Sequence, residues 1–372
     1  MTVFSIKNVG VFNGEAIERP TELYFQGSPG NILDNDLGTA GTIDGTNCTL
    51  IPGLIDAKID GDASTAMLPK FATFGVTTLI DSSSGTAESS AMREASARNA
   101  AMPSYLASGS PVGSGGSDSD AFKKFPYRSI RQISTPAEAE SFVATHSTGP
   151  VRSDFIKVIA EDPGLDDDTL VALVEAAHRR GMLAVAHASQ TSAYRRVMEA
   201  GFDVVTPAPI TGALDSDVVR GFAEKKIAVI PTLYFLRHIM RMGKIDEHNF
   251  SFAVDAVRIL HQAGVPICAG TSANDEEGFT VGFGDALHEE LKLLVEAGLS
   301  NKEVLQAATS VPSEVFRLHD RGTLKPGTRA DLVLVEGNPL EDIAASLRIV
   351  KVWIHGVEVG NGEQSEGEDN GE

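Results

Sequence analysis

Residues 50–57 read LIPGLIDA, an apolar run interrupted by a Pro-Gly turn, and the run continues to Lys58 and Asp60. Side chains at positions i and i+2 of a strand point to the same side, so these two charges are expected to lie next to each other. This stretch is the first of eight apolar runs bounded by turn residues. The other seven occupy residues 76–81, 104–108, 154–160, 182–188, 202–206, 226–232 and 265–270.

Amphipathic stretches with helix-end signals lie between most of these runs. Residues 166–181 begin with three aspartates and end with two arginines before a glycine, and residues 191–201 and 246–264 also end on glycine. Acidic first turns, basic last turns and a terminal glycine are typical of helices. Eight strands that alternate with helices predict an α/β fold of the (β/α)8 TIM-barrel type, with near-continuous apolar runs as buried parallel strands.

The two ends of the chain have a different pattern. Residues 1–49 and 330–359 carry short alternating strands with Gly and Asn turns, which predict a small β-sandwich domain built from both termini. The expected division is a composite β-domain (1–50 plus 320–359), a TIM-barrel catalytic domain (51–319) and a disordered acidic tail (360–372). The Gly/Ser-rich residues 109–125 are expected to be a lid or a disordered loop.

Composition restricts the partners of the protein. The 372 residues are 42% hydrophobic and 22% charged, and the net charge is −20. An acidic chain argues against a nucleic-acid partner, and no apolar stretch reaches the roughly 18 residues of a membrane span. No signal peptide is recognisable, and the two cysteines, Cys48 and Cys268, suit buried thiols in a reducing compartment. We therefore expect a cytoplasmic protein that acts on a small molecule, with a homo-oligomer left open.

Two motifs carry a resemblance to a known family. The first is LIPGLIDA after an N-terminal β-region, and the second is the long segment LHEELKLLVEAGLSNKEVLQAATSVPSEVFRLHDRGTLKPGTRADLVLVEGNPLEDI at residues 287–343. Together they resemble the amidohydrolase superfamily, and most nearly its imidazolonepropionase and prolidase-like hydrolases. The resemblance covers nearly the whole chain.

The resemblance implies one or two divalent metals at the carboxyl ends of the barrel strands, but most of the implied ligand positions carry other residues. The strand-four lysine and the strand-five histidine are present as Lys157 and His187. The remaining positions, which normally hold His-x-His, a second histidine and an aspartate, fall on Lys58, Asp60, Pro207 and Ser272. An ammonium has no lone pair for a cation, so the sequence predicts that the binuclear site has been lost and that no metal is bound.

Lys58, Asp60, Lys157 and His187 are the candidate catalytic residues. Lys58 and Asp60 form either a structural ion pair that fills the vacated metal site or an acid/base pair. A lysine that points into a barrel needs a charge partner or a lowered pKa, so Lys157 is expected to pair with Asp60, to act as a base or to form a Schiff base. His187 is the natural proton shuttle. Candidate substrate-binding residues are Thr232, Tyr234 and Ser272.

Three functions compete on this basis. The leading hypothesis is a metal-independent enzyme of isomerase, cyclase, dehydratase or lyase type that acts on a small carbonyl compound with no cofactor. The second is an amide or ester hydrolase with one Zn or Mn ion held by Asp60, carboxylated Lys157 and His187. The third is a catalytically dead hydrolase that binds a ligand.

Overall fold

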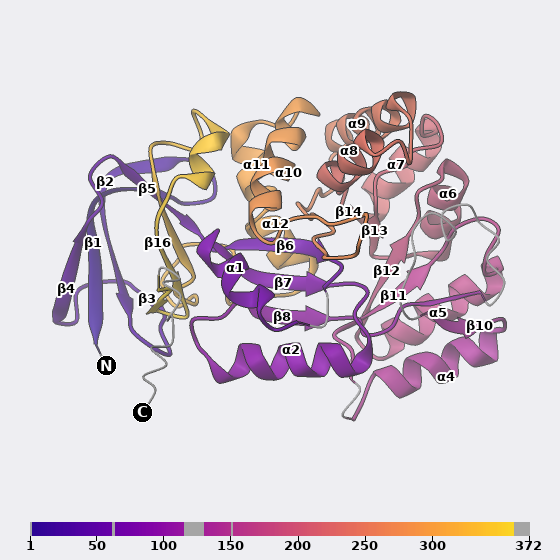
Figure 1. Ribbon diagram of the computed structural model, residues 1–372, viewed down its shortest axis with the longest axis horizontal. Helices are drawn as coiled ribbons and strands as arrows, with labels where there is room; N and C mark the ends of the chain where they lie inside the picture. Colours follow the sequence, from indigo (N-terminus) through magenta and orange to yellow (C-terminus); the bar gives the residue numbers. More distant parts are fainter. Residues whose placement is uncertain (1, 62–63, 115–129, 150–151, 361–372) are drawn as a thin grey trace, which may run out of the picture.

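The computed structural model describes residues 2–61, 64–114, 130–149 and 152–360. Their elements form an α/β fold in which a β-sheet from both ends of the chain stands beside parallel strands surrounded by helices (Figure 1). Among the described residues, no helix is long and apolar enough to cross a membrane. The expected acidic tail lies outside the described residues, apart from Gly360.

The sheet at the end of the molecule combines the N-terminal and C-terminal strands. Its order is β17-β16-β15-β5-β1-β2-β3, with β4 on β1, and its centre is the antiparallel pairing of β5 and β15, where Ile51 opposes Val333. Apolar side chains such as Leu50, Leu332 and Trp353 form a separate core cluster on it. The union of both termini agrees with the sequence prediction. The strands are β1 Val3–Phe12, β2 Ile17–Gln26, β3 Ile32–Leu33, β4 Thr39–Asp44, β5 Cys48–Pro52, β15 Leu332–Glu336, β16 Ile349–Ile354 and β17 Val357–Glu358.

The remaining strands form two parallel sheets, of order β6-β7-β8 and β10-β9-β11-β12-β13-β14. Their residues are almost all buried, as their uninterrupted apolar sequence predicts. The strands are β6 Leu54–Ile59, β7 Val76–Asp81, β8 Ser104–Ala107, β9 Val112–Ser114, β10 Arg131–Ile133, β11 Phe155–Ile159, β12 Leu183–His187, β13 Val204–Thr206 and β14 Ala228–Val229.

Three strand predictions need correction. The run 50–57 is two strands, because Gly53 separates β5 in the terminal sheet from β6 in the parallel sheet. Residues 265–270 form no ladder and join their neighbours only through the isolated bridge of Val229 to Ile267 and through single hydrogen bonds. The predicted loop 109–125 contains β9, which pairs with β10 and β11, while its residues 115–125 lie outside the described part.

Helices follow most of the parallel strands and pack around them (Figure 1). The three helices predicted from their end signals are present: α5 begins at an Asp166 cap, α6 ends at left-handed Gly201, and α9 begins with a capping box on Asp246. The helices are α1 Met67–Thr73, α2 Thr86–Arg98, α4 Pro136–His146, α5 Asp167–Arg179, α6 Thr191–Ala200, α7 Ser216–Lys225, α8 Leu233–Arg241, α9 Glu247–Gln262, α10 Asp285–Glu296, α11 Asn301–Ala307, α12 Ser310–Val315 and the short 3-10 helix η1 Ile343–Leu347.

Gly53 joins the two sheets at a point with no room for a side chain. A Cβ on this residue would lie 2.2 Å from the Thr77 hydroxyl oxygen of β7. The Gly53 amide donates to the Asp331 carbonyl at 2.8 Å, and the next amide, of Leu54, donates to Gly75 of the parallel-sheet side at 2.9 Å. The chain therefore passes from one sheet to the other within one residue, which places Lys58 five residues after the junction.

Candidate active site

A pocket of about 460 Å³ opens where the parallel strands end. Its floor includes Lys58 and Asp60 at the end of β6, His187 at the end of β12, and Ser272 in the segment before α10. Hydroxyl-bearing residues line it where the chain leaves β7 and β8, and apolar residues line it after β13, along α8 and in the loop before α10. The hydroxyl group is Ser83, Ser84, Thr86 and Ser110, and the apolar group is Pro207, Ile210, Phe235, Leu236 and Phe279. A volume of this size suits a small-molecule substrate.

The Lys58 ammonium is held in the floor by two partners. It donates to Asp60 Oδ2 in a short ion pair and to Ser272 Oγ at 2.7 Å. Lys58 is 5% exposed, so solvent weakens this pair less than it would weaken one on the surface. Burial would raise the pKa of Asp60, but the Lys58 charge and hydrogen bond, together with Lys157 and Ser83, hold that pKa below its ordinary value. The expected adjacency of Lys58 and Asp60 is therefore present.

Lys157 lies in the interior of the parallel strands, 1% exposed, and is not among the residues that line the pocket. Burial and the neighbouring Lys58 charge lower the pKa of its amine well below the usual value, although Asp60 acts in the opposite direction. Its Nζ lies 3.5 Å from the Ala186 carbonyl oxygen on β12. The buried Lys157 amine therefore gives up its proton more readily than an exposed lysine does.

His187 ends β12 and faces a carboxylate that the sequence analysis did not select. Its Nε2 lies 3.4 Å from Glu161 Oε1, and the same carboxylate oxygen accepts the Ser189 amide at 2.6 Å. Burial lowers the pKa of His187, which Glu161 partly offsets, while Lys157 and Lys58 lower it further. Glu161 directly follows the predicted strand 154–160, so the rule that barrel chemistry lies at carboxyl ends of strands would have found it.

Two buried carboxyl groups lie below the floor. Asp56, two residues before Lys58 on β6, accepts the Thr271 hydroxyl at 2.7 Å and the Thr271 amide at 3.1 Å, and burial raises its pKa to about 7. Glu290 of α10 accepts the amides of Leu233 and Tyr234 at 3.0 and 2.6 Å, and burial raises its pKa to about 8. The hydrogen bonds of Asp56 hold the backbone next to Ser272 in place, and those of Glu290 hold the start of α8.

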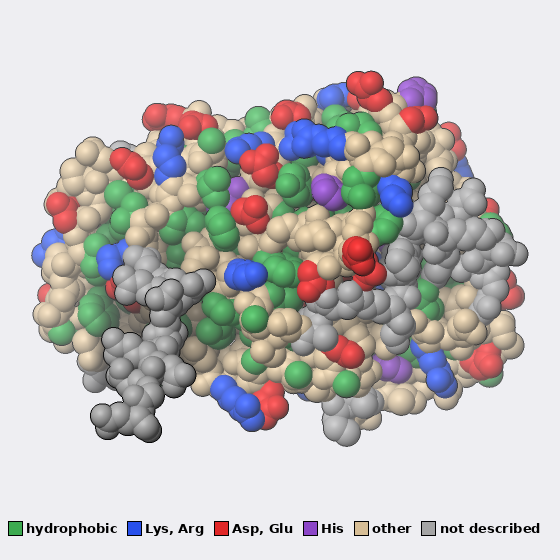
Figure 2. Space-filling model, viewed as in Figure 1, with side chains coloured by type: hydrophobic (Ala, Val, Ile, Leu, Met, Phe, Trp, Pro, Cys, Tyr) green, Lys and Arg blue, Asp and Glu red, His purple; other side chains and the backbone are tan. Residues whose placement is uncertain are grey.

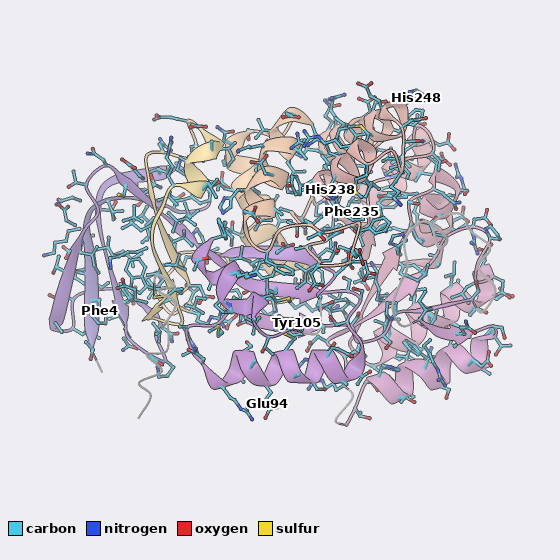
Figure 3. All side chains as sticks on the ribbon, viewed as in Figure 1. Phe4, Glu94, Tyr105, Phe235, His238 and His248 are labelled. Carbon is cyan, nitrogen blue, oxygen red and sulfur yellow. The ribbon has the colours of Figure 1, made fainter. Side chains whose placement is uncertain are left out.

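Asp81 organises the hydroxyl-bearing loop. Its Oδ1 accepts the amides of Ser83 and Ser84 at 2.9 and 3.1 Å, and its Oδ2 accepts short hydrogen bonds from the hydroxyls of Ser84 and Tyr105. Figure 3 labels Tyr105 on β8. Burial raises the pKa of Asp81 despite these donors. The network holds the turn after β7 against the pocket, and its only sequence signal was an aspartate at the end of a predicted strand.

The three predicted substrate-binding residues have different positions. Ser272 and Thr232 both line the pocket, and both have positive φ angles, of 55° and 50°. Tyr234 does not line the pocket: its amide is held by Glu290, and its half-buried ring lies 5.9 Å from the Arg237 guanidinium carbon. The left-handed backbone of Thr232 starts α8 so that the next pocket residues are Phe235 and Leu236 rather than Tyr234.

The residues present do not fit a binuclear metal centre. The Lys58 ammonium lies between Asp60 and Ser272, where it would repel a cation, and Pro207 offers no side-chain donor. Among the described residues, no group of three His, Cys, Asp or Glu side chains is arranged to hold an ion. The donor chemistry of this floor therefore suits protons and polar substrate atoms.

A model described as the amidohydrolase family matches residues 49–359. Curated relatives match shorter pieces. Adenine deaminase 2 of Desulfotalea psychrophila is 38% identical over 71 residues, which are 19% of this chain and 11% of that protein. An uncharacterised protein of Mycobacterium tuberculosis is 28% identical over 156 residues, 39% of this chain and 40% of its own length. The chain thus spans between about a tenth and two fifths of these relatives.

Solved structures match over nearly the full length. A Xaa-Pro dipeptidase with bound methionine superposes with a TM-score of 0.81 at 20% identity, covering 96% of this chain and 99% of that one. The ochratoxinase of A. niger gives a TM-score of 0.80 at 19% identity and covers 99% of this chain and 98% of its own. At these identities the likeness shows the fold.

Proposed function

Because this chain belongs to the amidohydrolase family, we propose that it is an amidohydrolase-type enzyme that has exchanged metal-assisted hydrolysis for proton transfer on a small carbonyl compound. The reaction class is isomerisation, cyclisation, dehydration or lyase cleavage, without a metal or other cofactor. The observation that carries the proposal is the Lys58 ammonium, fixed by Asp60 and Ser272 in the floor of an open pocket.

Lys58 supplies the electrophilic half of the chemistry. A carbonyl oxygen placed beside its ammonium gains a hydrogen bond and a compensating charge as an enolate or alkoxide develops. Asp60 and Ser272 hold the ammonium in position before the substrate arrives, so little reorganisation accompanies the reaction. A Ser272 hydroxyl that accepts from Lys58 is left with its own hydrogen to donate elsewhere.

His187 supplies the basic half. Burial lowers its pKa, so the imidazole is neutral near pH 7 and able to accept a proton. In the proposed step a ring nitrogen of His187 takes a proton from the carbon beside the carbonyl, the C–H electron pair forms the enolate, and the resulting imidazolium later returns the proton to product. Glu161 stabilises that imidazolium.

In this proposal the buried Lys157 assists the reaction without contacting the substrate. A neutral amine next to the Lys58–Asp60 pair accepts or returns a proton through Asp60 without adding a second permanent cation. Because Lys157 does not line the pocket, a Schiff base on it would require the floor to rearrange. The amine is therefore assigned a supporting role, and a Schiff base is the less favoured alternative.

The barrel and the domain boundaries are part of the same proposal. We assign residues 51–319 to a (β/α)8 barrel and residues 1–50 with 320–359 to a composite β-domain. Closure is supported on one side by a direct link between the two parallel sheets, Asp154 N to Ala107 O at 2.9 Å. On the other side, residues 265–273 join β6 through Ala57 N to Ala269 O at 2.9 Å and the bridge of Ile59 to Ala273, and join β14 through the bridge of Val229 to Ile267. Residues 265–273 then serve as the eighth strand position.

A one-metal hydrolase is the competing proposal, and one observation favours it. Asp60 Oδ1 and Glu161 Oε2 are buried acceptors with no hydrogen-bond partner among the described residues. A buried carboxylate oxygen without a hydrogen-bond partner is a favourable position for a bound cation. The open pocket of about 460 Å³ suits a ligand-binding pseudoenzyme as well as an enzyme, so it does not separate these two functions.

Hydrogen exchange in heavy water tests the proposal. The protein, stripped of metals with a chelator and checked by inductively coupled plasma mass spectrometry, is incubated in D2O with a panel of ketones, keto acids and lactams, and deuterium beside the carbonyl is followed by NMR. We expect exchange on at least one compound, at least 100-fold slower in Lys58→Met and His187→Gln. Exchange that appears only after zinc or manganese is restored, or that both variants retain, contradicts the proposal.

A further inference from the structure

The strand pairings give the order in which the strand ends surround the pocket. β7 pairs with β6 and β8, β12 pairs with β11 and β13, and β13 pairs with β14. The bond from Asp154 N to Ala107 O joins the starting end of β11 to β8, and residues 265–273 contact both β14 and β6. The ends therefore follow one another as β6, β7, β8, β11, β12, β13, β14 and residues 265–273.

The two halves of the proposed chemistry occupy opposite sides of this order. Lys58 follows from β6 and Ser272 from the neighbouring residues 265–273, whereas Glu161 and His187 lie at the ends of the neighbouring strands β11 and β12. The strands β7 and β8 separate these two pairs on one side, and β13 and β14 separate them on the other. A carbonyl oxygen at Lys58 and a C–H bond at His187 therefore define a line across the pocket.

The two remaining sides of the pocket are walls of opposite character. The wall after β7 and β8, here called the hydroxyl wall, consists of Ser83, Ser84, Thr86, Glu88 and Ser110, and the wall after β13 and β14, here called the apolar wall, consists of Pro207, Ile210, Phe235 and Leu236. Ser83 and Thr86 on the first wall and Ile210 and Phe235 on the second are half-buried, so part of each is accessible to a ligand (Phe235 is labelled in Figure 3). A substrate whose carbonyl lies on the line from Lys58 to His187 therefore has apolar side chains on one side and hydroxyl groups on the other.

The charge of the hydroxyl wall restricts the polar side of the substrate further. Among the described residues of this wall, Glu88 is the only charged one, and none is Lys, Arg or His. A carboxylate on the substrate would lose part of its hydration there and would lie near a like charge. The hydroxyl wall therefore favours an uncharged group that forms hydrogen bonds.

We propose that the substrate is an internal carbonyl compound with two unlike arms. One arm is apolar, either aromatic or branched aliphatic, and packs on the apolar wall. The other arm is uncharged, carries a hydroxyl or a similar hydrogen-bonding group, and bonds to the hydroxyl wall. The proposal rests on the proposed function in placing the carbonyl between Lys58 and His187.

The binding affinities of matched ketones test this assignment. The probes are 1-hydroxy-3-phenylpropan-2-one, which has both arms; 1-phenylbutan-2-one, in which a methyl group replaces the hydroxyl; and 1-hydroxy-1-phenylpropan-2-one, an isomer with both groups on one arm. Each is titrated against the full chain by ligand-observed NMR. We expect the two-armed ketone to bind about fivefold more tightly than either of the others, which is the usual contribution of one hydrogen bond. Equal affinity for the three ketones overturns the proposal.

A second pair of probes tests the charge of the polar arm. Methyl 4-oxo-5-phenylpentanoate is uncharged, and 4-oxo-5-phenylpentanoate carries a carboxylate at the same place. We expect the ester to bind about tenfold more tightly than the carboxylate. Tighter binding of the carboxylate overturns the assignment of an uncharged arm.

Variants of the two walls locate each arm. Ser83→Ala/Thr86→Val removes two hydroxyls, and it should abolish the advantage of the two-armed ketone over 1-phenylbutan-2-one. Phe235→Ala should weaken the binding of both these ketones by a similar factor, since both carry the phenyl arm. The control Ile259→Ala should change neither affinity, because Ile259 is 41% exposed on α9 and does not line the pocket.

An unchanged advantage in a Ser83→Ala/Thr86→Val protein with native circular dichroism overturns the proposal. Ser110→Ala takes the place of the double variant if that protein fails to fold. The proposed function fails separately: loss of deuterium exchange with the expected order of ketone affinities contradicts proton transfer and leaves the substrate class standing. Exchange on a ketone, together with equal affinities for the three probes, gives the opposite result.

Discussion

Glu161 and His187 meet at the carboxyl ends of the neighbouring parallel strands β11 and β12, with Glu161 Oε1 3.4 Å from His187 Nε2. Both side chains are nearly excluded from solvent, at 1% and 11% exposure. A carboxylate in that place orients the ring and favours its protonated form, whereas burial favours the neutral form. The balance between these two effects gives the first prediction.

Glu161→Gln should lower the pKa of His187 further, because the carboxylate that partly offsets burial is removed. The shift is read from the imidazole Cε1 proton by NMR during a pH titration. The unfolded histidine takes up a proton below about pH 6.5, and the folded one does so only at lower pH. Wild type should therefore lose stability as the pH falls below about 6.5, and Glu161→Gln should continue to lose it to a lower pH.

The control His187→Gln should not show the loss of stability that comes from protonating this histidine. An unchanged His187 titration in Glu161→Gln would show that the carboxylate does not act on the ring.

Lys58→Met should lower the free energy of unfolding by about 2–4 kcal/mol, because it leaves the buried Asp60 carboxylate without its cation. The double variant Lys58→Met/Asp60→Asn removes both charges and should recover at least half of the loss. Urea unfolding followed by circular dichroism measures both. If the single variant is as stable as wild type, the ion pair has no structural importance and only its catalytic role remains.

Asp56→Asn should stabilise the protein increasingly as the pH rises from about 4 to about 7. The folded Asp56 carboxyl keeps its proton up to a pKa of about 7, whereas the unfolded carboxyl ionises near 3.8, so wild type loses stability across that interval. Asparagine does not ionise, and its amide can still bond Thr271. The difference should reach at most about 4 kcal/mol and stay constant above pH 7, as measured by urea unfolding at unit pH steps. A difference that does not vary with pH would mean that Asp56 is ionised in the fold.

Gly53→Ala should lower the free energy of unfolding by roughly 1–3 kcal/mol, because the added Cβ would lie 2.2 Å from Thr77 Oγ1. The backbone on either side is fixed by hydrogen bonds to both sheets, so the chain has little freedom to move away. Gly360→Ala is the matched control, since a Cβ there meets nothing within 4 Å. Equal stability of the two variants would show that the junction is looser than its contacts imply.

The alternation of apolar runs and helix-end signals was sufficient to predict the α/β class, most of the parallel strands and the union of both termini. These patterns did not predict the features that depend on contacts between distant parts of the chain. Residues 265–270 are apolar enough for a strand, yet their backbone joins its neighbours through single bridges and isolated hydrogen bonds instead of a ladder. Gly53 divides LIPGLIDA between two sheets because of a contact with Thr77, which the local sequence does not reveal.

The candidate site was also predicted only in part from the sequence. Lys58, Asp60, His187 and Ser272 were predicted because the family resemblance places its metal-ligand positions on them, and all four line one pocket. Tyr234 is not among the pocket-lining residues, and the carboxylate that accepts its amide is Glu290, which the local sequence does not place beside it. Charges on the face shown in Figure 2 are mixed, with Lys and Arg side chains near Asp and Glu, so the acidic total is not gathered over one element there.

The pairing of β5 with β15 has a consequence for synthesis. Ile51 and Val333 are neighbours in the sheet, yet the ribosome makes them about 280 residues apart. The strand that leads directly to Lys58 therefore stays unpaired on one edge until residues 332–336 have emerged. Translation pauses or early stops before residue 332 would leave that edge open to other nascent chains, so the yield of native protein depends on how quickly β15 follows.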